Sequence, residues 1–483
     1  MAHRIRLVSQ LFADGRPDAA LATAEEFVME APDDPLGYFL LADCHARLGS
    51  GRVAVELIRQ ARALGGSVPD GLSDAFLQTC AVTPFDFDYS EILCRPSPWL
   101  GHWSAGREPS PLHDRLIKAT LDLHRQAWEA GEIAAPMRAD AYGPAGEAEP
   151  SLPRLTVLVA MLERVGLDPA FIESDVRPNF VGSARGVGLD AHAFSTDTMT
   201  YETNLVGLDD TEIKRARDEL EATIARLRPA LVVTDGNYIP TGRGMGVEDW
   251  NALKARFGFR MAVVIPDCYD IPERNDDKLA YWSGCADVLS VFHPYSRAVT
   301  AFPDPARLLV CPSFPFDETR FAVEGVAKSR ELFFVGTVSR QRQALVNAAG
   351  AAGMSGWCQL HNRKRDQAPS YEEYIQGLLS SRLSLNNGRV APNSYIVTGR
   401  TAESMLAGSL LLEDVGSPLD EYYVPWVHYV PFSSLHELIV LLRFFQSHEE
   451  ERARIAEAAR AQWRRHYSNR RHWAALLRKA GLG

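Results

Sequence analysis

Between residues 152 and 313, amphipathic stretches alternate with short runs that are apolar along their whole length. Apolar residues at every third or fourth position predict a helix, and a short uninterrupted apolar run predicts a buried strand. In chain order, helices are expected at 152–167, 211–227, 247–258 and 277–285, and strands at 170–174, 230–235, 260–267, 287–293 and 307–313. Fully apolar strands separated by helices indicate a parallel sheet that is covered on both faces.

A second series with the same alternation begins at Glu331. Expected strands at 331–336, 356–361, 382–386, 409–414 and 427–432 are separated or followed by expected helices at 342–353, 371–381, 401–407 and 435–445. The fold class is therefore predicted to be α/β, with two Rossmann-like doubly wound domains at 151–318 and 319–483. The segment "PSFPFDETRFAVEGVAKSR" connects the two series.

The N-terminal part has a helical pattern with an internal repeat. Gly15 and Gly49 are 34 residues apart, as are Ala20 and Ala54, which is the tetratricopeptide period. Residues 3–68 therefore resemble two tetratricopeptide repeats, and residues 1–83 form a predicted helical module. The expected buried seam between its helices consists of Tyr38, Leu41, Leu48, Leu57 and Ile58. Residues 84–150 are predicted to be a linker and helical region, with a helix at 112–131.

Composition narrows the function classes. The formal net charge of −11 argues against a general binder of nucleic-acid phosphates, and no apolar run is long enough to span a bilayer. The beginning lacks the apolar core of a signal peptide, so we expect a cytoplasmic protein. Seven cysteines without a CxxC pair predict reduced, buried thiols rather than a metal site.

Polar residues gather where the strands of the second series end. The run "FFVGTVSRQR" ends its strand at Gly336 and Thr337 and opens a helix with Arg340 and Arg342. This arrangement suits a diphosphate, because glycine allows close approach, a helix start offers amide groups, and arginine presents a fork of donors. We therefore expect these residues to bind the phosphates of a nucleotide.

The third strand and the next helix supply further candidates. They are Asn386 and Asn387 at the strand end and Thr398, Arg400, Thr401 and Glu403 at the helix start. A carboxylate in this position can accept two hydrogen bonds from a ribose diol. The alternative is that Glu403 complements the dipole of its own helix as a first-turn acid.

The segment "YEEYIQGLLSSRLSLNNG…TGRTAESMLAGSLLLED" and the closing basic helix with "HYSNRRH" resemble the C-terminal domain of CgeB-like, spore-maturation type glycosyltransferases of the GT-B fold. The resemblance spans about residues 330–478 and is looser over 150–320. It implies that the second sheet domain binds a nucleotide sugar and that the cleft between the sheets holds the acceptor. The chain departs from related enzymes at Tyr395, where a second glutamate often grips the sugar, which leaves the sugar and the stereochemical outcome open.

The resemblance also implies a reaction that needs no metal and no cofactor beyond the nucleotide-sugar substrate. We expect Arg340 and Arg400 to stabilise the departing diphosphate. An inverting enzyme would need a base for the acceptor proton, for which Asp267 is the first candidate, with Asp235 and His293 behind it. A retaining enzyme would need no such base.

The function predicted from the sequence is glycosyl transfer from a nucleotide donor to an acceptor. Because helical repeats offer grooves for peptide segments, a protein acceptor, such as a surface or flagellar protein, is the first hypothesis. A polysaccharide or lipid-linked acceptor is the alternative within the enzyme class. The rival from another class is a non-catalytic GT-B scaffold that recruits partners through its helical module.

Overall fold

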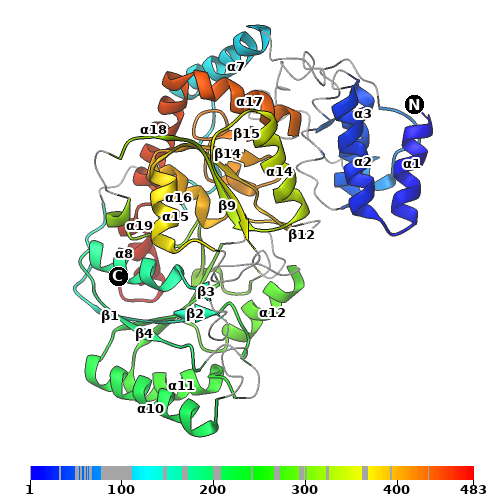
Figure 1. The fold of residues 1–483 in the computed structure, drawn as a ribbon. Helices are drawn as coiled ribbons and strands as arrows, with labels where there is room; N and C mark the ends of the chain where they lie inside the picture. Colours follow the sequence, from blue (N-terminus) through cyan, green and yellow to red (C-terminus); the bar gives the residue numbers. More distant parts are fainter. Residues whose placement is uncertain are drawn as a thin grey trace.

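The structure is a computed structural model of the chain. It describes residues 2–31, 34–48, 68–77, 111–144, 149–165, 172–199, 208–240, 243–265, 272–292, 302–321, 326–361, 368–391, 394–432 and 435–483, together with residues 54, 57, 58, 61, 64 and 299. Two sheet domains lie one above the other, and three N-terminal helices stand to one side of the upper one (Figure 1). The N-terminal helices are α1 (Ala2–Ala13), α2 (Pro17–Glu30) and α3 (Pro35–Arg47).

The N-terminal helices pack as antiparallel neighbours. Gly15 has a positive φ of 68° in the turn between α1 and α2, where a residue with a side chain would be strained. Gly37 on α3 lies so close to Val28 of α2 that an added Cβ would be 3.1 Å from its side chain. The predicted seam residues Tyr38, Leu41, Leu48, Leu57 and Ile58 are all buried. The helical character of this part is confirmed, whereas its assignment to tetratricopeptide repeats stays a prediction, and Gly49 lies outside the described residues.

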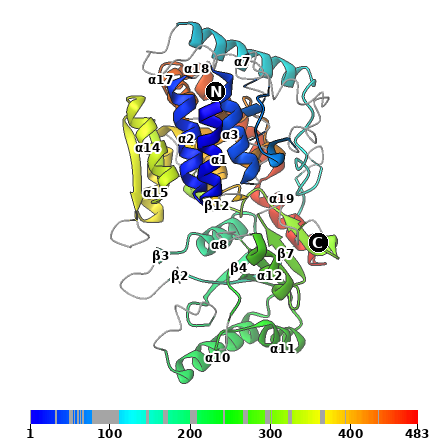
Figure 2. The ribbon, with the colours of Figure 1, turned by 90° about the vertical axis from the view of Figure 1, so that its right-hand side faces the viewer.

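The first sheet has six parallel strands in the order β4-β1-β5-β6-β7-β8. Their bounds are β1 Thr156–Met161, β4 Asp190–Ser195, β5 Leu231–Asp235, β6 Arg260–Ile265, β7 Val288–Val291 and β8 Leu308–Val310. Helices α10 (Asp210–Leu227), α11 (Val247–Phe257) and α12 (Pro272–Trp282) cover one face, and α8 (Val176–Gly186) and α19 (Asn469–Lys479) cover the other. Figure 2 shows α10 and α11 at the far end of the molecule from α7 and α17.

The prediction of a helix at 152–167 is wrong, because Thr156–Met161 forms the strand β1, an interior strand of this sheet between β4 and β5. The run "TVLVAM" is buried on both faces of the sheet, so it carries no alternation that would distinguish a strand from a buried helix. Of the strand expected at 170–174, residues 170 and 171 lie outside the described residues, and Ile172–Glu173 form β3, which pairs with β2, Arg164–Val165.

The second sheet has five parallel strands in the order β10-β9-β11-β14-β15. Their bounds are β9 Arg330–Thr337, β10 Gly356–His361, β11 Ser381–Asn386, β14 Leu410–Asp414 and β15 Val430–Phe432. Helices α14 (Arg340–Ala351) and α17 (Leu435–Ser447) pack on one face, and α15 (Tyr371–Leu379) and α16 (Gly399–Ala407) on the other. The predicted α/β class with two Rossmann-like domains preceded by helices is therefore confirmed.

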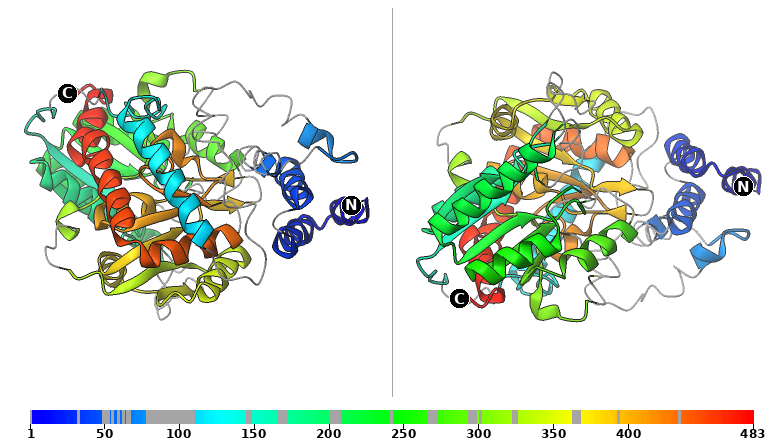
Figure 3. Two further views of the ribbon diagram at one scale, coloured as in Figure 1. Left: turned by 90° about the horizontal axis from the view of Figure 1, so that it is seen from above. Right: turned by 90° about the horizontal axis from the view of Figure 1, so that it is seen from below.

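The last two helices join the two sheet domains. Helix α18 (Glu449–His466) packs on α16, and α19 crosses back to the first domain, where the indole of Trp473 donates to Ser183 Oγ of α8 at 3.1 Å. The predicted helix at 112–131 is α7 (Pro111–Glu129), which runs over the top of the second domain (Figure 3). One continuous apolar cluster contains residues of both sheets and of α19, so the two sheet domains share packed core.

Candidate functional site

The candidate site lies where the order of the second sheet reverses. Strand β9 has β10 on one side and β11 on the other, so the helices that follow β9 and β11 leave toward opposite faces. In open parallel sheets, ligands bind in the crevice at the carboxyl ends of such a strand pair. The side chains at this edge therefore decide what the domain can bind.

Arg400, near the start of α16, reaches across this edge. Its Nη2 donates to the carbonyl oxygen of Val335 at the end of β9, and its Nη1 donates to Asn386 Oδ1 at the end of β11 at 3.4 Å. Its Nε donates to the Tyr374 hydroxyl at 3.2 Å. A guanidinium has five N–H groups, so three held in this way orient the plane and leave two for a ligand.

Glu403 does not face open space. Its side chain is buried, with a relative exposure of 3%, and each carboxylate oxygen accepts a hydrogen bond of 2.9 Å, Oε1 from Tyr371 and Oε2 from Tyr374. Both tyrosines lie on α15, one helical turn apart and stacked with their ring planes 19° apart. In this arrangement the carboxylate is occupied by protein donors, and a ribose could be bound only after one tyrosine moved aside.

A second buried carboxylate, Glu413, lies beside Asn386. The two residues are register partners on β14 and β11, and Asn386 Nδ2 donates to both carboxylate oxygens of Glu413 at 3.1 and 2.8 Å. Glu413, Tyr371 and Tyr374 are not among the site residues predicted from the sequence. The signal for Glu413 was present, because it ends the apolar run "SLLLE" next to a strand that ends in asparagine.

Burial changes the acid–base behaviour of both carboxyls. Loss of solvation raises the pKa of Glu403 to about 7, with Asp175 adding to the rise and the two tyrosines opposing it. Loss of solvation also raises the pKa of Glu413 to about 8, and the Asn386 hydrogen bonds oppose that rise. Both carboxyls therefore keep a proton to a higher pH than an exposed glutamate does, and the charge of Arg400 opposes that rise in each case.

The predicted phosphate residues come together at the end of β9. Arg342 Nη1 donates to the Thr337 carbonyl at 3.0 Å, and a Cβ added to Gly336 would be 3.3 Å from the same nitrogen. The Arg342 side chain thus folds back over Gly336. Ser339 caps α14 by accepting from the Arg342 amide at 3.2 Å. Arg340 opens α14, and its side chain lies outside the described part of the structure.

At the start of α16, two hydroxyl groups have no hydrogen-bond partner within the described part of the chain. Thr398 is the N-cap residue and makes no capping hydrogen bond. Among the described residues, Thr398 Oγ1 and Thr401 Oγ1 are buried without a hydrogen-bond partner. A buried hydroxyl without a partner costs stability, so these two groups at a helix start need an explanation. Gly399 between them lies against the Phe314 ring, which an added Cβ would approach to 3.3 Å.

The structure describes the positions of some of the other predicted residues and not of the rest. Asn387 follows Asn386 and donates to Asp414 Oδ2 at 3.3 Å, beside the Glu413 pair. Asp235 ends β5 and accepts from the Asn237 amide at 2.7 Å. Asp267 and His293 lie outside the described residues, as does the side chain of Tyr395.

A hydrogen-bond chain connects the site with the first domain. Asn179, fully buried on α8, donates to the Tyr371 hydroxyl at 2.8 Å, and Tyr371 donates onward to Glu403. The side-chain oxygen of Asn179 accepts from the Asp317 amide in the segment between the domains at 3.0 Å. The site is therefore tied to the relative position of the two domains.

Two further features of the described residues bear on function. No three His, Cys, Asp or Glu side chains in the described ranges are grouped so that they could hold a metal ion. The helices described here include none with the length and apolar character to cross a membrane.

One part of the chain matches a known protein family. Residues 330–478, about a third of the sequence, match a family model described as "Glycosyl transferase-like". No curated protein matches the sequence. The matched residues begin with β9 and end in α19, so they contain the whole candidate site.

Solved structures give weaker similarities. Anabaena HepE in complex with UDP-glucose is 11% identical, covers 68% of this chain and 99% of its own, and has a TM-score of 0.44. A sucrose-phosphate synthase from Thermosynechococcus elongatus is 12% identical, with coverages of 68% and 98% and a TM-score of 0.41. An O-GlcNAc transferase from Thermobaculum terrenum is 13% identical, with coverages of 100% and 97% and a TM-score of 0.37. The similarity to a known family is therefore confined to residues 330–478, which match the glycosyl transferase-like model.

Proposed function

We propose that the protein is a glycosyltransferase that binds a nucleotide-sugar donor at the carboxyl edge of its second sheet. The observation that carries the proposal is that the family match at 330–478 coincides with an edge where the Val335 carbonyl, Asn386 and Tyr374 hold the Arg400 guanidinium in place. An arginine that keeps its charge and two N–H groups can bind phosphate oxygens strongly.

In the proposed reaction, the bond between the anomeric carbon and the diphosphate oxygen breaks, and the acceptor oxygen forms the new bond to that carbon. The diphosphate leaves with the bonding electrons, and Arg400, Arg340 and the starts of α14 and α16 stabilise its charge. Thr398 and Thr401 are proposed to donate to the same group. If configuration is inverted, Asp267 takes the acceptor proton, and Asp235 or His293 are the alternatives.

We further propose that the reaction uses no metal and that the acceptor is a protein bound along the N-terminal helices, in the cytoplasm. The three-helix arrangement of α1, α2 and α3 beside the second sheet domain supports an acceptor-binding role for this module (Figure 1). Acceptor identity is tested by mass spectrometry, because a transferred sugar adds a hexose-sized or nonulosonate-sized mass to the candidate protein.

Donor binding is tested by thermal unfolding with UDP, GDP, TDP and CMP. A nucleotide at a hundred times its dissociation constant stabilises the folded state by about 2.7 kcal/mol, so a true ligand raises the midpoint clearly. Stabilisation by one nucleotide class supports the proposal, and no response to any of them contradicts it.

One observation favours a second candidate function, a non-catalytic scaffold with a GT-B body. Both oxygens of Glu403 are engaged by tyrosines, and Asn386 is paired with Glu413, so the edge satisfies many of its own polar groups. A scaffold would fail the nucleotide screen but would still capture a protein partner through the N-terminal helices.

A further inference from the structure

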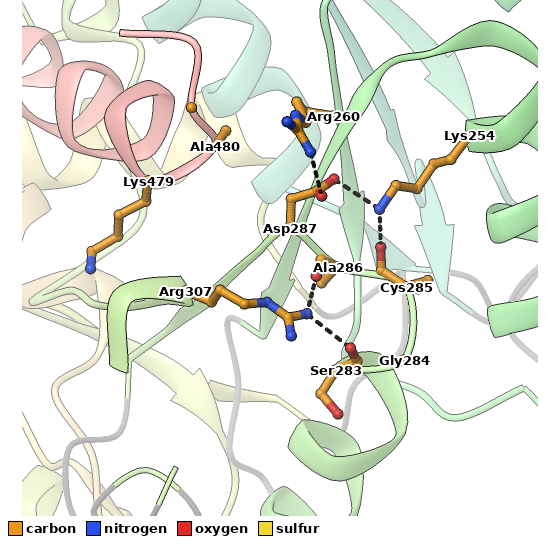
Figure 4. A pocket seen from close by; sticks show the side chains of 11 residues that line it. Lys254, Arg260, Ser283, Gly284, Cys285, Ala286, Asp287, Arg307, Lys479 and Ala480 are labelled. Atoms are coloured by element: carbon orange, nitrogen blue, oxygen red, sulfur yellow. Dashed lines mark hydrogen bonds and ion pairs between the residues drawn. The ribbon is translucent and has the colours of Figure 1, made fainter. Parts of the chain in front are cut away.

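A basic pocket lies at the edge of the first sheet that is formed by the amino ends of its strands. Arg260 begins β6, Asp287 immediately precedes β7 and Arg307 immediately precedes β8, so the pocket is at the amino ends of three neighbouring parallel strands. The last residues of α19 and the residues after it, Lys479 to Gly481, form its other wall. Figure 4 shows Lys254 and Arg260 on one side and Lys479 with Ala480 on the other.

The pocket has a surplus of positive charge. Its lining contains four cationic side chains, Lys254, Arg260, Arg307 and Lys479, against the single carboxylate of Asp287. Asp287 is already shared, because it pairs with Lys254 at 2.8 Å and with Arg260 at 3.3 Å. This surplus occurs in a chain whose net charge is −11, so it is a local feature and not a general basic character.

Two of the cations have carbonyl partners only. Arg307 Nη2 donates to the carbonyl oxygens of Ser283 (2.9 Å) and Ala286, and Lys479 donates to those of Pro305 and Ala306 at 3.3 and 3.1 Å. Within the described part of the chain, neither forms an ion pair, although Asp304 is near enough to Lys479 to act on it electrostatically. Carbonyl oxygens orient these groups without cancelling their charge.

The N–H groups that are still available in the pocket indicate which kind of ligand it can bind. The amides of Gly284, Cys285, Ala286 and Asp287 all donate to backbone carbonyls, so an anion would be bound by side chains and not by a backbone loop. Arg260 and Arg307 keep N–H groups that have no partner among the described residues, and guanidinium groups match the geometry of phosphate oxygens. The cavity of about 480 Å³ has the size of a small-molecule site.

We propose that this pocket binds a small phosphorylated molecule carrying at least two negative charges, at a site separate from the carboxyl edge of the second sheet. The cavity of about 480 Å³ and the acidic net charge of the chain favour a small molecule over a nucleic acid. Because one wall belongs to the end of α19 and the other to the first sheet, the ligand holds the end of the chain against the first domain. The inference does not depend on the proposed glycosyltransferase function.

The test is isothermal titration calorimetry of the full chain with inorganic pyrophosphate. The double variant Arg260→Gln, Lys479→Gln should bind pyrophosphate at least tenfold more weakly than the unmodified protein. The matched control is Arg256→Gln on α11, an exposed arginine outside the pocket that pairs with Glu221 and should leave binding unchanged. Arg400→Met distinguishes pyrophosphate binding in the pocket from binding at the carboxyl edge of the second sheet, because binding in the pocket survives this change.

Three results would overturn the proposal. They are the absence of pyrophosphate binding, binding that the double variant retains, and equally tight binding of sulfate at matched ionic strength, which would indicate an unspecific cationic surface. The single change Arg260→Gln repeats the test without altering α19, since the Arg260 side chain is 54% exposed and contributes little to folding.

Discussion

The carboxyl edge of the second sheet and the basic pocket of the first sheet each combine arginine with acidic side chains. They differ in how far the acidic side chains are exposed to solvent. In the pocket, Asp287 and Arg260 form a partly exposed pair that water and salt screen. At the carboxyl edge, Glu403 and Glu413 are buried, and Arg400 acts on both of them electrostatically. Burial raises the pKa of both acids, so these two carboxyls keep a proton to a higher pH than exposed glutamates do.

The comparison is tested most strongly by removing Arg400. Arg400→Met leaves Asn386 Oδ1, the Tyr374 hydroxyl and the Val335 carbonyl without this donor, so we expect a loss of about 2–4 kcal/mol of folding stability. Nucleotide affinity should fall at least a hundredfold. Urea unfolding measures the first effect and calorimetry the second. Arg454→Met, at an α18 arginine paired with Glu451, is the matched control and should change neither quantity substantially.

The next largest effect is the pH dependence caused by Glu413. Its pKa is higher in the folded state than its ordinary value of 4.5, so the folded protein binds this proton more tightly. The stability contribution is therefore fully present below pH 4.5 and is lost as pH rises to about 8, at about 1.4 kcal/mol for each unit of pKa difference.

Glu413→Gln removes this titration. Between pH 5.5 and 8.5, the free energy of unfolding should fall by at least about 2 kcal/mol more in the unmodified protein than in the variant. Chemical unfolding at three pH values measures the difference. Parallel pH profiles for the two proteins would show that Glu413 titrates normally. The carboxyl edge would then not differ from the open pocket in the way described.

A smaller effect distinguishes ligand groups from structural groups on α16. Thr401→Val removes a buried hydroxyl that has no partner in the described structure, so the free protein should become more stable by about 1 kcal/mol. Its nucleotide affinity should nevertheless fall several-fold. Ser404→Ala is the control, because Ser404 donates to the Arg400 carbonyl at 2.6 Å and contacts Ser384 Oγ at 2.8 Å. It should lose stability, and a Thr401→Val protein with unchanged affinity would argue against a ligand role.

The smallest effect is expected in the open pocket. Arg260→Gln removes a partly exposed ion pair to Asp287, and its cost should be below about 0.5 kcal/mol and should vanish in high salt. Thermal unfolding at low and high salt measures it. A loss comparable to that of Arg400→Met would mean that the two sites do not differ in the way described.

Much of this edge follows from sequence because strand ends in a parallel sheet converge. The sequence predicts Asn386 at a strand end and Arg400 at the next helix start as candidates of one edge, and in the structure Arg400 Nη1 lies 3.4 Å from Asn386 Oδ1. The contacts of Glu403 could not be predicted in this way, since they depend on how α15 is rotated against α16. That rotation is set by packing between residues 371–379 and 399–407, and not by any local pattern.

The misassigned strand β1 has a different cause. Apolar residues at 152, 155, 158 and 162 imitate a helical spacing, while the strand itself is buried on both faces and shows no alternation. Its interior place in the sheet, between the edge strand β4 and β5, is a property of the whole fold. The predicted base Asp267 and the predicted domain boundaries stay predictions.

The most direct test of the central claim is a co-crystal structure with the nucleotide that stabilises the protein best. The account predicts phosphate density within hydrogen-bond distance of Arg400 and of the start of α16, with Thr401 as a donor. Density at another edge, or a carboxyl edge that stays closed by Tyr371 and Tyr374 at saturating nucleotide, would contradict it.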